Sequence, residues 1–179
     1  MASIHAPSEH TVPEDIFYAH ALLIEHEAAE RYREFARCLS DYGDGKLAQL
    51  FWQLAECEIE HEHRLAQRAA GIALPRIAAG EHAWIDSDAP LPEAHAFVCN
   101  MLTPRLALEI AARAEQRATT FFEEAVSKTS DPGVQALALD MARDEKSNLA
   151  RVSAALEHAP QPYRPNEDLP GDPTIPQQL

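Results

Sequence analysis

The sequence has little cysteine and little glycine, and each shortage excludes a class of protein. Its three cysteines, Cys38, Cys57 and Cys99, are odd in number and lie far apart. We therefore expect no disulfide framework and no Cys-x-x-Cys metal site, which is typical of a protein from a reducing compartment. Only 6 of the 179 residues are glycine, whereas Ala, Leu, Glu and Arg are abundant, so helices are favoured over strands.

Positive charge and long apolar runs are scarce as well. The chain has 15 Lys and Arg residues against 29 Asp and Glu residues, which gives a formal net charge of -14. Such an acidic protein repels nucleic acids and anionic membranes and attracts cations. Neither a transmembrane run nor a basic segment followed by an apolar one is present, so we expect no membrane span and no secretory signal. We expect a cytoplasmic protein with no nucleic-acid or membrane partner.

The remaining sequence is dominated by four segments with helical periodicity. The pattern predicts helices over about 13–39, 45–70, 104–129 and 132–158. The short links within each half contain Asp and Gly, which favour tight turns, so each half is predicted to form an antiparallel hairpin. Thr103 and Pro104 are suited to the N-cap and first position of the third helix.

The other segments are rich in proline or in polar residues. Residues 1–13 are predicted to form a loose N-terminal arm, and 159–179 a proline-rich extended tail. Residues 72–103 are predicted to form a long crossover that includes a short helix at 92–102. Two hairpins joined by a long crossover are typical of an all-α, ferritin-like up-down four-helix bundle, here over residues 14–158.

Each predicted helix carries an apolar stripe that one glutamate interrupts near its middle. The four glutamates are Glu25, Glu58, Glu115 and Glu145. Four unpaired carboxylates in one core would be very costly, so something positive should lie among them. The arginines of these helices mostly fall outside the stripes, which makes a metal cation the simplest hypothesis.

The residue types around Glu58 fit such a cation. His61 follows Glu58 by three positions, so both side chains point the same way on a helix. Carboxylates are hard donors that can bridge two cations, and a neutral imidazole suits iron, manganese or zinc. Residues 55–65 also align with 142–152, which pairs Glu58 with Glu145 and His61 with Asn148. The alternative is that Glu58 and His61 belong to an exposed polar patch.

The segments IEHEAAERYREFA (24–36) and LAECEIEHEHRL (54–65) resemble the first two helices of rubrerythrin and of the wider ferritin-like di-iron family. The resemblance extends over about residues 15–158. It implies a di-iron site, with manganese or zinc as possible substitutes. The ligands that it implies are Glu25, Glu58, His61, Glu115 and Glu145, with Asn148 at a further ligand position. It also implies that Tyr32 is a phenol beside the metals with a possible catalytic role.

The sequence departs from the family pattern in three places. Asn148 stands where a second histidine is expected, so the second metal position could be labile, lost or completed by water. Ala118 stands where the family has a further glutamate that takes part in its redox chemistry. No rubredoxin module is present, since the chain has no Cys-x-x-Cys pair, so an electron donor would be a separate protein.

The resemblance implies an iron protein that oxidises Fe(II) with peroxide or dioxygen, as a peroxidase or ferroxidase in oxidative stress or iron handling. We expect a homodimer rather than a storage shell. The alternative is a metal-binding or degenerate bundle that acts as a non-enzymatic dimerisation or iron-handling module.

Overall fold

The computed structural model describes residues 12–77 and 102–160, which form four α-helices and no strand within those ranges. The helices are α1 (Glu14–Asp41), α2 (Gly45–Arg68), α4 (Pro104–Lys128) and α5 (Pro132–His158). Their ends differ from the predicted ones by no more than two residues. The predicted helix at 92–102, most of the crossover, and nearly all of the arm and tail lie outside the described residues.

Three of the four helices begin at a side chain that caps the first turn. The caps are Asp44, Thr103 and Asp131, and each accepts a hydrogen bond from a backbone N–H of its helix. Pro104 and Pro132 follow two of them at the first helical position, where a missing N–H costs nothing. These local signals fix where α4 and α5 start.

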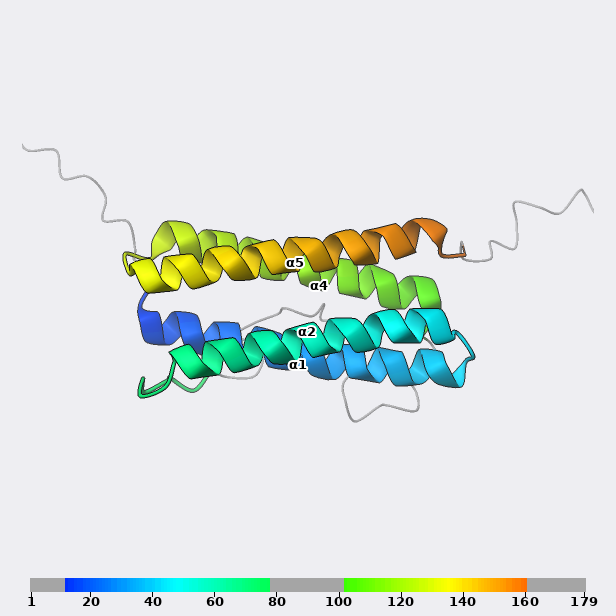
Figure 1. Ribbon diagram of the computed structural model, residues 1–179, viewed down its shortest axis with the longest axis horizontal. Helices are drawn as coiled ribbons and strands as arrows, with labels where there is room; N and C mark the ends of the chain where they lie inside the picture. Colours follow the sequence, from blue (N-terminus) through cyan, green and yellow to red (C-terminus); the bar gives the residue numbers. More distant parts are fainter. Residues whose placement is uncertain (1–11, 78–101, 161–179) are drawn as a thin grey trace, which may run out of the picture.

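The helices form two antiparallel hairpins stacked as two layers (Figure 1). The α1–α2 hairpin is one layer and the α4–α5 hairpin the other, with α1 beside α4 and α2 beside α5. A backbone hydrogen bond of 2.9 Å from Val12 N–H to the Lys128 carbonyl joins the start of α1 to the end of α4. The expected all-α, ferritin-like four-helix bundle is confirmed.

The apolar core is split into two clusters, one towards each end of the bundle. One cluster is built around Phe35, Phe51 and Leu108, and the other around Phe17 and Phe122. On every helix the central glutamate of the stripe falls between the residues of the two clusters. The four acids therefore occupy one layer across the middle of the bundle, which confirms that they lie at corresponding depths.

The sequence predicted no disulfide framework, yet one of the two described cysteines is disulfide-bonded. It is Cys38, which is buried in α1, whereas Cys57 is a free thiol. The inference of a reducing compartment from unpaired cysteines therefore loses its basis. Separately, none of the helices in the described ranges is long and apolar enough to cross a membrane.

Removal of the α5 cap should destabilise the bundle measurably. Asp131 Oδ1 accepts hydrogen bonds of 2.8 Å from the N–H groups of Gly133 and Val134. We expect Asp131→Ala to lower the free energy of unfolding by about 1 kcal/mol. Chemical denaturation followed by circular dichroism would measure this loss. Asp131→Asn keeps a capping oxygen and should retain most of the stability, so an equal loss in both variants would contradict the capping role.

Candidate metal centre

The central glutamates meet His61 in one buried cluster. Glu25, Glu58, His61 and Glu145 each offer a ligand atom, and these atoms all lie within 4.8 Å of one another. Each of the three carboxylates is only 1% exposed, and His61 is 5% exposed. The alternative that Glu58 and His61 form an exposed polar patch is therefore wrong.

The contacts of His61 are those of a group surrounded by anions. Its Nδ1 lies 3.2 Å from Glu25 Oε2, 3.3 Å from Glu58 Oε2 and 3.1 Å from Glu145 Oε1. One ring nitrogen carries at most one proton, so it cannot donate to three carboxylates at once. Three carboxylate oxygens and one imidazole nitrogen that converge in this way form a typical donor set for a divalent transition metal.

Several oxygens of the cluster make no hydrogen bond in the protein. They are Glu25 Oε1, Glu115 Oε2 and Glu145 Oε1, all fully buried. A buried polar atom without a partner costs roughly 1–3 kcal/mol, and more if it is charged. A bound cation would satisfy these atoms, so the residues present fit a metal.

Glu115 lies at the edge of the cluster, and Tyr32 holds it there. The Tyr32 hydroxyl donates a hydrogen bond of 2.6 Å to Glu115 Oε1, and both residues are buried. Glu115 also lies against Glu145, but it is not one of the four residues whose ligand atoms converge. The structure therefore places both Tyr32 and Glu115 beside the converging group, on the side of α1 and α4.

Asn148 is buried at the centre too, but its amide nitrogen faces the carboxylates. Its Nδ2 donates a hydrogen bond of 3.0 Å to Glu58 Oε1. Helical spacing from Glu145 would continue the apolar stripe of α5 to Leu149, but Leu149 is only half-buried, whereas Asn148 is 4% exposed. The buried face of α5 therefore includes Asn148 at this point, because its amide has a polar partner, Glu58, on α2.

Two residues beside His61, Asp144 and Arg64, were not predicted from the sequence. Asp144 Oδ2 lies 3.4 Å from His61 Nε2, and the same oxygen accepts a hydrogen bond of 2.9 Å from Arg64. A carboxylate on the remote nitrogen of a metal-binding histidine fixes the ring and its tautomer. The only signal in the sequence was that Asp144 is the neighbour of Glu145. One residue along a helix corresponds to a rotation of about 100°, so Asp144 lies off the apolar stripe of α5.

A small cavity of about 20 Å³ adjoins the cluster between α1 and α4. Its apolar wall includes Ala28, Ala114 and Ala118. Its polar lining includes Tyr32, Glu58, Glu115 and Glu145. The cavity has room for about one molecule the size of water.

Burial and mutual repulsion hold protons on the cluster. Burial, together with the nearby Glu58 carboxylate, raises the pKa of Glu145 to about 8 and those of Glu25 and Glu115 well above their usual range. Burial alone would lower the pKa of His61, but its contacts with Glu145, Glu25 and Glu58 outweigh this and raise it. A metal would have to displace these protons.

The metal-free protein should therefore become less stable as the pH rises from 5 to 8. Glu145 has a pKa near 4.5 in the unfolded chain and about 8 in the fold, so in this range the folded state binds more protons. The raised pKa of His61 acts in the same direction. Thermal unfolding in the presence of a chelator would measure the trend. Glu145→Gln should flatten it, and a melting temperature that rises from pH 5 to 8 would contradict the shifts.

Comparison with known proteins agrees with this centre. The family model for rubrerythrin matches residues 17–156, which include all four central glutamates. A solved structure of an uncharacterised conserved protein from Magnetospirillum magnetotacticum MS-1 is similar, with a TM-score of 0.74 and 27% identity over 86% of this chain and 99% of that chain. No curated protein matches the chain. Because the family model spans most of its length, the chain belongs to the rubrerythrin family.

Proposed function

We propose that the protein is a non-haem di-iron or related metal protein that oxidises Fe(II) with peroxide or dioxygen. Its role would be that of a peroxidase or ferroxidase in oxidative stress or iron handling. The observation that carries this proposal is the buried group of Glu25, Glu58, His61 and Glu145 in a chain of the rubrerythrin family. Iron is the favoured metal, and manganese or zinc would fit the same donors.

The ligands would fall into two sets that share two carboxylates. Glu25 and His61 belong to one set, and Glu115 to the other. Glu58 and Glu145 belong to the converging group and also line the cavity beside Glu115, so they would hold metal together with either set. Bound iron would supply the electrons that reduce peroxide to water.

The other residues would control access and protons. The cavity between α1 and α4 adjoins the cluster and has room for about one molecule the size of water, so we propose that a small oxidant such as peroxide or dioxygen reaches the carboxylates there. Tyr32 places a hydroxyl in the cavity wall and holds Glu115 through its hydrogen bond. We propose that this positioning is the contribution of Tyr32, which the sequence suggested as a catalytic residue.

The remaining partners stay predictions. A separate electron-donor protein would restore the reduced state, since the chain has no Cys-x-x-Cys pair of its own. A cytoplasmic homodimer is still expected.

The second candidate is a bundle that handles iron without turnover, or that serves as a dimerisation module. The orientation of Asn148 favours it, because an amide N–H directed at Glu58 adds nothing to the metal ligands. Peroxide consumption measured with a reduced electron donor would separate the two, since only the enzyme would turn over many times.

Loss of the Glu58 carboxylate should weaken iron binding and slow Fe(II) oxidation together. We expect Glu58→Gln to lower iron affinity and the rate of peroxide-driven Fe(II) oxidation by more than about 100-fold. Mutation of a residue that only hydrogen-bonds to a metal ligand already lowers affinity or activity by about 10- to 100-fold. Iron analysis and stopped-flow absorbance after anaerobic loading would measure both. The control is Glu60→Gln, an exposed acid on the same helix. Unchanged iron content in Glu58→Gln would count heavily against the proposal.

A larger side chain in the cavity should slow oxidation without removing the metal. Ala118 lines the cavity, so Ala118→Leu should fill it and slow reaction with peroxide by about tenfold or more, because a small displacement of a reactant is costly. Iron content should stay at the wild-type level. Ala150→Leu, at an exposed position of α5, is the matched control. Equal oxidation rates in both variants would show that the oxidant enters elsewhere.

A further inference from the structure

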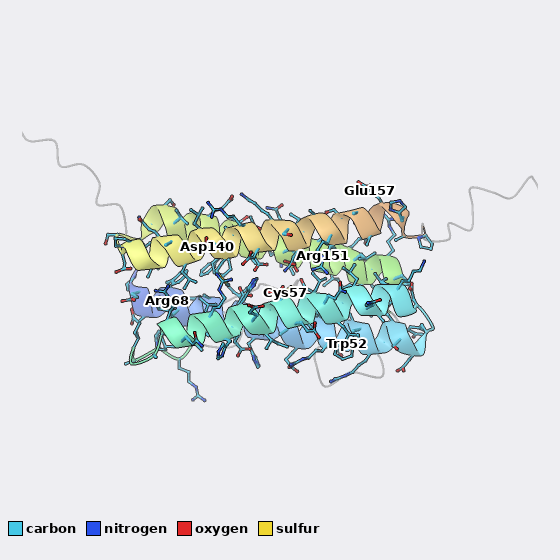
Figure 2. All side chains as sticks on the ribbon, in the orientation of Figure 1. Trp52, Cys57, Arg68, Asp140, Arg151 and Glu157 are labelled. Carbon is cyan, nitrogen blue, oxygen red and sulfur yellow. The ribbon has the colours of Figure 1, made fainter. Side chains whose placement is uncertain are left out.

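The buried amide of Asn148 is held from both sides. Its Nδ2 donates to Glu58 Oε1 at 3.0 Å, and its Oδ1 faces Arg151 Nη1 at 3.4 Å. Arg151 is itself anchored by a hydrogen bond of 2.7 Å from Nη2 to Gln53 Oε1 on α2. Figure 2 shows Arg151 close to Cys57, on the side of the bundle formed by α2 and α5.

These contacts fix which end of the amide faces the carboxylates. A guanidinium group can only donate hydrogen bonds, so the atom of Asn148 that faces Arg151 must be the oxygen. The nitrogen then faces Glu58, which as a carboxylate accepts its hydrogen bond. An amide nitrogen has no lone pair to offer a metal, so Asn148 in this orientation is a donor to a ligand and not a ligand.

We propose that the centre has two unequal metal positions and that Asn148 makes them unequal. This inference rests on the metal site of the proposed function. The strong position has Glu25 and the imidazole of His61 together with Glu58 and Glu145. Among the described residues, the weak position has only Glu115 in addition to the two shared carboxylates, and no nitrogen ligand.

Charge adds to the difference in ligands. The hydrogen bond from Asn148 occupies Glu58 Oε1, an oxygen that could otherwise bind a second ion. Arg151 places a positive charge behind that amide, and this charge repels a further cation. One ion therefore binds first, and the second binds only at a higher metal concentration.

The chain offers a gain-of-function test of this asymmetry. Position 148 follows Glu145 by three residues, as His61 follows Glu58, so a histidine there would point at the weak position. Metal-free full-length protein would be titrated anaerobically with Co(II), followed by calorimetry and by visible absorption. We expect wild-type protein to bind one ion tightly and a second at least about 10-fold more weakly.

Two variants and one control define the outcome. Asn148→His should tighten the second dissociation constant by at least about 10-fold and add a nitrogen-ligand band in the visible spectrum. Asn148→Ala, which frees Glu58 Oε1 without adding a ligand, should tighten the second dissociation constant by less than Asn148→His does. Ala150→His places an imidazole on the exposed side of the same helix and should behave as wild type.

The results separate this inference from the function on which it rests. Two ions bound with equal affinity by wild-type protein, or loss of one ion in Asn148→Ala, would overturn the asymmetry and leave the metal centre standing. Failure of wild-type protein to bind any Co(II) would overturn the metal centre and the proposed function with it.

Discussion

Burial of four carboxylates in one layer of the bundle is the constraint on which the rest of the structure depends. Each helix contributes one acid, and the apolar core is divided into two clusters on either side of that layer. Burial of like charges is tolerated only where protons or a cation compensate them. In the protein alone the compensation comes from His61 and from the raised pKa values of the acids. A metal replaces both, so the geometry of the core and the affinity for a cation have the same origin.

The two hairpins contribute differently to this layer. Within each hairpin the helices pack closely along their length, whereas the contacts between the layers are sparser. The interaction of α1 and α2 with α4 and α5 includes contacts through the centre, such as those of Tyr32 with Glu115 and of His61 with Glu145. A bound ion would therefore join the two layers as well as carry chemistry, and binding free energy would become folding stability.

Two departures from the family sequence acquire a physical meaning in the structure. Asn148, in place of a histidine, becomes a hydrogen-bond donor to Glu58, held by Arg151. Ala118, in place of a glutamate, lines the small cavity beside the acids. Asn148 therefore lies with Arg151 on the side of α2 and α5, whereas Ala118 lies with Glu115 on the side of α1 and α4.

The sequence by itself determined the four helices, their caps and the presence of one acid in each apolar stripe, because periodicity and capping depend on neighbours a few residues away. It also indicated that Glu58 and His61 point the same way, since they lie one turn apart on one helix. Only the tertiary structure decided the direction of the Asn148 amide, the contact of Asp144 with His61 and the cavity beside Ala118. Each of these depends on atoms from different helices. Spacing along a helix tells which way a side chain points, but the partner that it meets is fixed only when the helices pack.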